Sequence, residues 1–593
     1  MLANGIIALC ATRPLQTDVL QGRIASLLAS DERLDFVVSH DARCMLGAVI
    51  GSHGGQDAHP WLTLERSDTG DRLGVFEGWT YVPSVLTGNP ARLGERDLDC
   101  RTHCNGMFSA ASWREGTLTL ASDPFASIPL YVWSDSDVFV ASSSMEILLT
   151  LIPSEARLNR GALAELLAAQ TLFGDDTLIE GVRKMSGATL LRRTAQTGAE
   201  ESTRYWAPRF DVHGSVEHAA DAFAESVRRT VKLVGDQPHA ALTGGIDSRV
   251  IWAVLLHDRT PATAVTHAAA DGYDLQIAQC ISADHGLPHR IARIGDAFLA
   301  GAEEDLRRLV EAGNSQCCGD LLHLPYLYRV HAEYTPSIID GVNTYMERGF
   351  ALRRAAGGAR DRDQLVDSLW AQLRREGLLA LLPEDERRSI EATAKERFSH
   401  LLPDPADFHA PGAAADTLYL QQLLPHHATD AAAVQNHHVR FLTPYYDLDY
   451  LDILLRMPEA QRSAEWLQRE MLQRFAPRLL RYPRSYADVR TIPVKWRPLA
   501  LLPAFWERRV LPHLPGRVHG RLSLRRSSAL HAEWFAGPLH ALFRHAQPPP
   551  APLSPEATDA FLARLRLGGL SDTAAAGWLL VLSHPRSLLR RFS

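Results

Sequence analysis

The chain has 593 residues, of which 46% are apolar and 22% are charged, and its net charge is −7. This composition is typical of a globular protein and excludes a disordered, collagenous or coiled-coil chain, and the length predicts more than one domain. The charge balance offers no basic surface for nucleic acid, and no apolar run approaches the roughly 18–20 residues that cross a bilayer. The 7 cysteines, an odd number spread thinly along the chain, indicate reduced thiols and a cytoplasmic location.

Residues 1–205 are predicted to form a strand-rich domain. Residues 1–10 have no basic leader and only a short apolar stretch, and they are therefore expected to form a first strand and not a signal peptide. Short β-type runs then alternate with Gly, Asp and Ser turns up to about residue 150. A helix is expected over 158–169, and a hairpin follows around Gly187 and Gly198.

Residues 206–593 are predicted to form a second domain, because the periodicity changes near residue 215. A helix at 217–234 leads into an alternating series, which consists of strand 240–242, helix 247–257, strand 263–266, helix 274–285 and strand 289–294. This β-α-β-α-β order predicts a parallel sheet covered by helices.

The rest of the second domain is predicted to be mostly helical. Residues 351–415 are rich in Ala, Arg and Leu and predict an insertion of exposed helices. A helical extension is expected over about 500–593, in which the proline-rich segment 547–552 would be a stiff linker before a small C-terminal piece. The basic residues of 586–591 are expected to face solvent.

The strongest local signal is the sequence Leu242-Thr243-Gly244-Gly245-Ile246-Asp247-Ser248-Arg249, between a strand and a helix. Glycines without Cβ let the backbone approach a ligand, and consecutive N–H groups at a helix N-terminus bind anions. Asp247 could hold a divalent cation. The loop suits pyrophosphate, although no Gly-Lys-Ser/Thr of a Walker loop occurs. The simpler alternative is a strand–helix turn in which Asp247 or Thr243 caps the helix.

At these residues the sequence resembles the asparagine synthetase family, whose pyrophosphate loop looks like 243–248. Further motifs extend the resemblance from about residue 70 to 495. They are Cys104-Asn105-Gly106-Met107-Phe108, Ala121-Ser122-Asp123-Pro124, Ile128-Pro129-Leu130-Tyr131, Ala141-Ser142-Ser143-Ser144, Arg204-Tyr205-Trp206 and Pro444-Tyr445-Tyr446-Asp447.

The resemblance implies an α/β protein with an N-terminal αββα domain of the Ntn-hydrolase type and a C-terminal PP-loop domain of the adenine nucleotide α-hydrolase type. Members of the family use ATP and Mg²⁺ to adenylate a carboxylate, release pyrophosphate, and let an amine displace AMP. The implied ATP and pyrophosphate ligands are Leu242, Thr243, Gly244, Gly245, Asp247, Ser248, Arg249, Thr266 and Gly341, with Asp247 also on the metal.

Three departures from the family pattern bear on function. The family's glutaminase uses a cysteine directly after the initiator Met, whereas this chain has Leu2 there and its nearest cysteine is Cys10. We therefore expect no glutamine hydrolysis and a first domain that serves as a scaffold.

The second departure concerns the metal. Keeping Gly341 and Gly349 in register puts Tyr345 where the family has an acid, so the second ligand could be Glu347 or Asp340.

The third concerns the cation of the amide-forming step. Strict spacing falls on Thr491, and the nearest cations are Arg490 and Lys495. Lys495, Arg490 and Glu347 are our candidates for catalytic residues. Arg249 either offsets pyrophosphate charge or faces solvent from the first helical turn, and His437 or His438 is either a general base or a structural histidine.

In two features, the missing N-terminal cysteine and the Thr-Gly-Gly-x-Asp-Ser-Arg loop, the sequence looks most like the lasso peptide cyclases. These close a macrolactam between a precursor peptide's N-terminal amine and an Asp or Glu side chain. The partners implied are the precursor peptide, a leader peptidase and a leader-recognition protein. A β-lactam-synthetase-like or other small-molecule amide synthetase is the alternative, and a catalytically silent scaffold is the second.

Overall fold

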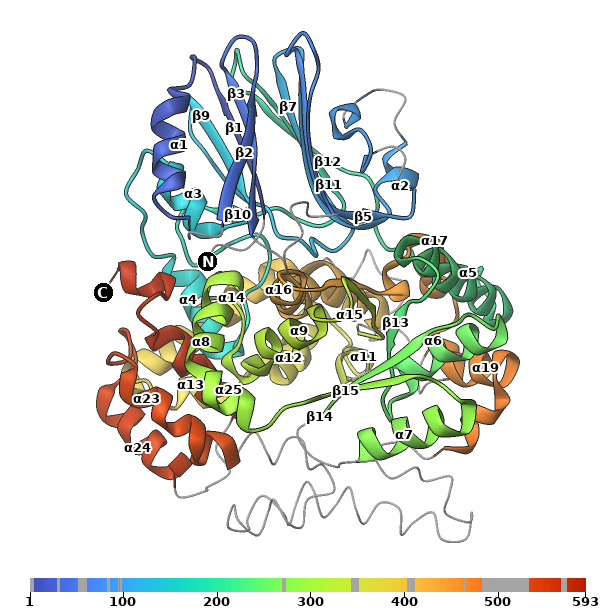
Figure 1. Ribbon diagram of the computed structural model, residues 1–593. Coiled ribbons are helices and arrows are strands. Elements are labelled where there is room, and N and C mark those ends of the chain that lie inside the picture. The colour runs from blue at the N-terminus through green and yellow to red at the C-terminus, as the bar shows by residue number, and fades with distance from the viewer. Residues whose placement is uncertain are drawn as a thin grey trace.

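A computed structural model describes residues 5–28, 32–51, 61–82, 86–93, 95, 99–268, 273–342, 351–402, 411–462, 466–482, 533–566 and 573–592. Two face-to-face sheets form the upper part of the molecule, and a parallel sheet with its helices forms the lower part (Figure 1). None of the helices in the described ranges is both long enough and apolar enough to cross a bilayer.

Each sheet of the upper sandwich has six strands. The first has the order β10-β8-β9-β1-β3-β2, and the second β12-β11-β7-β6-β5-β4. The strands are β1 (Gly5–Ala11), β2 (Glu32–Val38), β3 (Cys44–Gly51), β4 (Leu62–Arg66), β5 (Arg72–Thr80), β6 (Gly106–Arg114), β7 (Thr117–Ser122), β8 (Tyr131–Ser134), β9 (Val138–Ser142), β10 (Arg183–Lys184), β11 (Thr189–Thr194) and β12 (Glu200–Arg204). The expected first strand and the hairpin around Gly198 are therefore confirmed.

The alternation of side chains along β1 explains how the sandwich is held together. Ile6 and Ala8 face the second sheet, whereas Ile7 and Leu9 face the outer helices. Those helices, α1 (Thr17–Ala25) and α3 (Met145–Leu151), form the outer layer on this side.

The opposite outer face carries only short helices among the described residues. They are η1 (Pro90–Arg92) and α2 (Cys100–His103). A Cβ added to Gly74 on β5 would lie 2.3 Å from the backbone nitrogen of Ala91, so η1 lies directly against the sheet. Three of the four layers of the expected αββα fold are therefore present. In place of a full fourth layer of helices, the short helix η1 packs directly against the second sheet.

The lower sheet is parallel, with the order β15-β14-β13-β16-β17. Its strands are β13 (His239–Ala241), β14 (Thr263–Ala268), β15 (His289–Arg293), β16 (Ser337–Ile339) and β17 (Arg440–Leu442). Helices α5 (Val216–Val234), α6 (Ile246–His257), α7 (Tyr273–His285), α8 (Asp296–Ala312) and α9 (His323–Ala332) accompany them. All elements predicted over 217–294 are confirmed within two residues.

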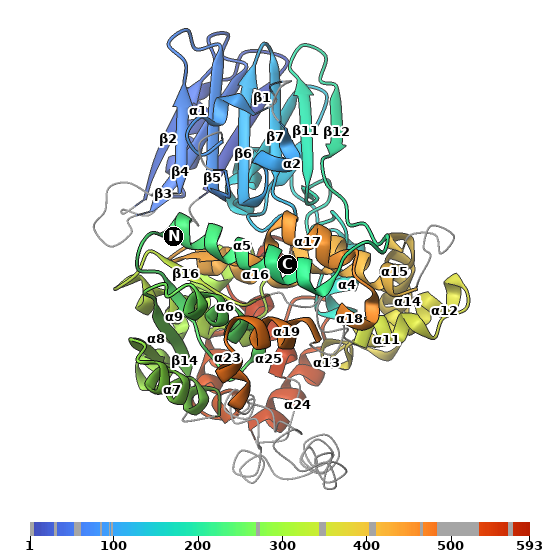
Figure 2. The ribbon, with the colours of Figure 1, turned by 90° about the vertical axis from the view of Figure 1, so that its right-hand side faces the viewer.

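The lower domain meets the sandwich through a layer of helices. Figure 2 shows the lower ends of the sandwich strands above α5, α16 (Leu424–Asn436) and α17 (Leu448–Leu455). The strand order reverses beside β13, which has β14 on one side and β16 on the other. Open α/β sheets bind ligands at such a switch point, outside the carboxyl ends of the strands.

The helical insertion is confirmed, and its helices are exposed on one face and buried on the other. Its helices are α11 (Ala351–Gly357), α12 (Arg362–Leu373), α13 (Glu376–Leu379), α14 (Glu384–Leu401) and α15 (Pro411–Leu418). Leu369, Trp370 and Phe398 are buried with residues of α4 (Arg160–Ala169). The amphipathic faces of the insertion therefore extend the core.

The C-terminal helices also belong to the main body, contrary to the prediction of a separate piece. After α23 (Leu542–His545) and α24 (Pro555–Arg566), helix α25 (Thr573–Ser583) is buried on most of its faces. A Cβ on Gly319 would lie 2.2 Å from the carbonyl oxygen of Gly577, so the backbone of α25 packs directly against the backbone at Gly319. The basic end is anchored as well, since the Leu588 N–H donates to Ser315 Oγ at 3.0 Å.

Candidate functional site

The loop 242–248 lies at the carboxyl end of β13 and opens α6, as the sequence predicts. Gly341 follows β16 and backs onto the same helix start. A Cβ at Gly341 would lie 2.9 Å from the Ser248 nitrogen and 3.1 Å from the carbonyl carbon of Asp247. Only glycine allows this approach, which brings the ends of β13 and β16 together at the switch point.

Three hydrogen bonds of ordinary length hold the loop in place. The Thr243 N–H donates to Ser248 Oγ at 3.1 Å, and the Gly245 N–H donates to Thr243 Oγ1 at 3.0 Å. The Gly244 N–H donates to a carboxylate oxygen of Asp274 at 3.0 Å. The loop therefore already binds one anionic oxygen through its backbone, which is the property that a phosphate site needs.

The simple capping alternative does not describe this loop. The N-cap position of α6 is Gly245 and receives no side-chain cap, while Asp247 lies in the first turn. A carboxylate in the first turn of a helix lies beyond the N-cap position and next to the loop amides. Asp247 is thus placed where its carboxylate could bind a cation that is also bound to phosphate.

Arg249 does not face solvent, because only 2% of its surface is exposed. Its guanidinium donates to the Gly244 carbonyl oxygen at 2.7 Å and to the Tyr482 carbonyl oxygen at 3.0 Å. One side chain therefore ties the loop to a segment more than two hundred residues away. It adds positive charge beneath the loop while holding its backbone.

Thr266 and Leu242 take part through the sheet. Thr266 is buried, and its hydroxyl donates to the Leu242 carbonyl oxygen at 2.6 Å and lies 2.8 Å from His289 Nε2. This hydrogen bond fixes the relative position of the β13 and β14 ends. Thr266 and Leu242 therefore act on the site by holding its backbone.

Three polar side chains lie together near the strand ends, namely His267, Asp274 and Asp340. Sequence reasoning named only Asp340 among them as a ligand, as an alternative for the metal. His267 interacts electrostatically with Asp340 and Asp274. Burial raises the pKa of Asp340, and His267 opposes that shift. Their places directly after parallel strands, or at the start of the next helix, were the signal available in the sequence.

Tyr445 is the other residue that the sequence analysis missed as part of the site. It lies in the short helix η5 (Pro444–Tyr446), and its hydroxyl donates to the Asp247 carbonyl oxygen at 3.1 Å. It therefore supports the first turn of α6 from the strand β17 side.

The metal site is incomplete in the described ranges. Within them, no group of three or more His, Cys, Asp or Glu side chains is arranged to hold a metal ion. Asp247 supplies one suitable carboxylate. Tyr345, Glu347, Arg490 and Lys495 lie outside the described residues.

His437 and His438, one of which was expected to be either a general base or a structural histidine, do not lie beside the loop. Both precede β17, at the opposite edge of the parallel sheet from the loop. His437 is buried and lines a small interdomain cavity of about 20 Å³ together with Glu77 and Asn314.

The first domain offers no comparable reactive centre at Cys10. This residue is fully buried within β1 and lies opposite Cys44 on β3. Burial raises the pKa of the Cys10 thiol to about 12, so it is protonated near neutral pH.

The chain is similar to known proteins in part. Residues 89–206 match the glutamine amidotransferase domain family. Putative glutamine-hydrolyzing asparagine synthetases of Mycobacterium tuberculosis and Mycobacterium bovis are 29% identical over 220 residues, which are 34% of this chain and 33% of the relative. The chain thus spans about a third of the length of the curated relatives it matches. These matches support an asparagine synthetase-like relationship.

Two solved structures share weaker likeness. Glutamine phosphoribosylpyrophosphate amidotransferase from B. subtilis, complexed with ADP and GMP, is 10% identical over 48% of this chain and 65% of that chain, with a TM-score of 0.22. NMN synthetase from Francisella tularensis is 17% identical over 32% of this chain and 93% of that chain, with a TM-score of 0.18. Likeness at these TM-scores supports no conclusion.

Proposed function

We propose that this protein is an ATP-dependent, AMP-forming amide ligase that closes a macrolactam in a precursor peptide, as lasso peptide cyclases do. The observation that carries the proposal is the close approach of Gly341 to the start of α6, beside a glycine loop whose amide already holds a carboxylate oxygen. A backbone cradle of this kind at the switch point of a parallel sheet suits the phosphates of ATP.

The first step would join a peptide Asp or Glu carboxylate to the α-phosphorus of ATP, with pyrophosphate as the leaving group. Such in-line transfer depends on positioning and charge neutralisation. Loop amides and the N-terminus of α6 supply partial positive charge, and Arg249 holds the loop that presents them. Mg²⁺, when bound with ATP, would neutralise phosphate charge, and Asp247 is the described residue that would hold it.

The second step would be attack by the peptide's N-terminal amine on the acyl-adenylate, with loss of AMP. The amine must be neutral, and Lys495 and Arg490 remain our candidates for stabilising charge in this step. Glu347 remains a candidate catalytic residue as the acid of the second metal position. Holding both ends of one peptide makes the attack intramolecular, which is worth effective molarities of about 10⁵–10⁸ M in favourable cases.

The buried Cys10 supports a reaction that uses a substrate amine and not ammonia from glutamine. In this proposal the precursor peptide arrives through a leader-recognition protein and a leader peptidase. The amidotransferase-like domain then serves as a scaffold.

ATP–pyrophosphate exchange with Mg²⁺ tests the proposal. Linear precursor peptides are compared with two controls, one with its acceptor Asp or Glu changed to Asn or Gln and one with an acetylated N-terminus. We expect exchange with the linear and acetylated peptides, and a product lighter by one water with the linear peptide only.

Other outcomes would redirect the proposal. Exchange supported by small amino-acid carboxylates but by no peptide would favour a small-molecule amide synthetase. Absence of exchange with every substrate, in a folded protein, would contradict the ligase proposal and favour a silent scaffold.

A further inference from the structure

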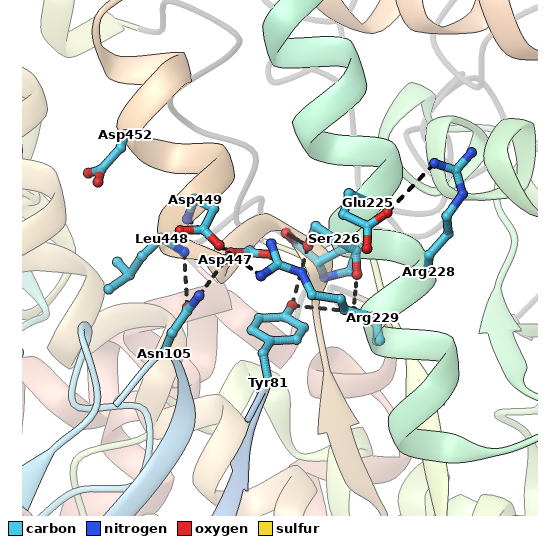
Figure 3. Close-up of polar contacts among 12 residues, drawn as sticks. Tyr81, Asn105, Glu225, Ser226, Arg228, Arg229, Asp447, Leu448, Asp449 and Asp452 are labelled. Atoms are coloured by element: carbon cyan, nitrogen blue, oxygen red, sulfur yellow. Dashed lines mark hydrogen bonds and ion pairs between the residues drawn. The ribbon is translucent and has the colours of Figure 1, made fainter. Parts of the chain in front are cut away.

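A buried asparagine of the first domain holds the start of a helix in the second. Asn105 Nδ2 donates to Asp447 Oδ1 at 3.0 Å, and the Leu448 N–H donates to Asn105 Oδ1 at 3.0 Å (Figure 3). Asp447 is fully buried, caps α17, and is also paired with Arg229 of α5. A single amide side chain therefore satisfies both a backbone donor and a buried carboxylate across the domain boundary.

A tyrosine of the first domain makes a second buried contact nearby. The hydroxyl of Tyr81 lies 3.3 Å from both Ser226 Oγ and Thr230 Oγ1 on α5. Ser226 Oγ donates to the Pro444 carbonyl oxygen at 2.7 Å, so toward Tyr81 it acts as acceptor. Burial raises the pKa of Tyr81, which keeps the phenol protonated as the donor.

These two contacts act at the two ends of the single helical turn η5. Pro444 begins η5, and Asp447 directly follows it. Between them, Tyr445 donates its hydroxyl to the Asp247 carbonyl oxygen and packs against Phe223 with ring centroids 4.7 Å apart. The first domain thus holds both ends of the turn whose middle residue supports the loop of the candidate site.

We infer that the amidotransferase-like domain positions the pyrophosphate loop, through Asn105, Tyr81 and η5, and that Tyr445 is the positioning residue that contacts the loop. Loss of the Asn105 amide leaves the buried Leu448 N–H without its acceptor, and loss of the Tyr81 hydroxyl removes a donor to Ser226, so we expect η5 to move. Tyr445 would then no longer hold the carbonyl of Asp247. This inference deepens the proposed function and rests on it for the meaning of the loop.

The test compares Asn105→Ala, Tyr81→Phe and Tyr445→Phe with wild type in the full chain. Arg228→Ala is the matched control, because Arg228 neighbours Arg229 on α5 but pairs with Asp258 at 2.7 Å and points away from this cluster (Figure 3). Tyr445→Phe keeps the ring and removes one hydroxyl, so it tests the inference even where Asn105→Ala does not fold.

The first measurement is amide hydrogen exchange of residues 242–250 without substrate. We expect exchange about tenfold faster in Tyr445→Phe and Asn105→Ala, as loss of a buried hydrogen bond predicts, and unchanged exchange in Arg228→Ala. Unchanged exchange of this segment in all the variants would overturn the inference.

The second measurement is pyrophosphate exchange. We expect a rise of about tenfold in the KM for ATP with a smaller change in the KM for peptide, because a displaced loop weakens phosphate contacts first. An inactive wild type whose loop still loosens in the variants would overturn the proposed function and leave the positioning role intact. An active wild type with unaltered loop exchange in the variants would overturn the positioning role alone.

Discussion

Strand β1 of the sandwich and strand β13 of the parallel sheet both run through the interior of their sheets, but they end differently. Cys10 of β1 is buried opposite Cys44, and its thiol stays protonated. Strand β13 leads into a loop with two glycines, in which the Gly244 N–H donates to a carboxylate oxygen of Asp274. The comparison teaches that a buried strand end keeps its cysteine protonated and enclosed, whereas anion binding by the backbone needs a strand end that side chains leave open.

The largest expected effect comes from the open strand end. Asp247→Ala should lower pyrophosphate exchange about 10³-fold, because a carboxylate at the loop acts on phosphate charge in the transition state. Asp258→Ala is the control, since Asp258 ends the same helix and pairs with Arg228 at the surface. Comparable loss of exchange in both variants would show that α6 and not the loop carries the effect.

The second prediction addresses the boundary between the two regions. Glu77 of β5 and Arg440 of β17 are buried at it, and burial raises the pKa of Glu77 from 4.5 to about 7 while Arg440 opposes the shift. The folded state therefore binds the proton more tightly than the unfolded state. The stability that this proton supplies is full below about pH 4.5 and is lost as the pH rises toward 7.

Glu77→Gln should remove that loss. Between pH 4.5 and 7, the free energy of unfolding of wild type should fall relative to the variant by as much as about 3 kcal/mol. Denaturant unfolding at several pH values measures this difference, and each protein is referred to its own value at pH 4.5 so that the altered pairing of Arg440 cancels. Parallel pH curves for the two proteins would contradict the prediction.

The local elements were predictable because their signals are local. The alternating apolar pattern over 217–294 and the glycine loop depend on neighbouring residues, and both were found. Burial of Arg249 and the contact of Tyr445 depend on partners 233 and 198 residues away, which periodicity does not encode. Helix α25 did carry a signal, since a helix apolar on every side is typical of a buried one, but the proline-rich segment before it suggested a separate piece.

The third prediction tests whether the C-terminal helix belongs to the core that also buries side chains of the parallel strands β14, β15 and β16. Gly319→Ala places a methyl group 2.2 Å from the Gly577 carbonyl oxygen. Overpacking against backbone should lower the free energy of unfolding by about 1–3 kcal/mol. Gly357→Ala is the control, because a Cβ there meets nothing within 4 Å. Equal stability of Gly319→Ala and wild type would mean that α25 shifts freely and is not part of that core.

The smallest effect is expected at the buried strand end. Cys10→Ala removes one sulfur atom from the space between the two sheets, so the free energy of unfolding should fall by only about 1 kcal/mol. Pyrophosphate exchange and peptide cyclisation should match wild type, because the thiol is protonated and enclosed. Loss of cyclisation in Cys10→Ala, with exchange and stability preserved, would contradict the contrast between the buried and the open strand end. The sandwich would then take part in the chemistry, and the amine reaching the acyl-adenylate would have to come through it. Retained cyclisation would show that amide formation does not use the Cys10 thiol, as its burial leads us to expect.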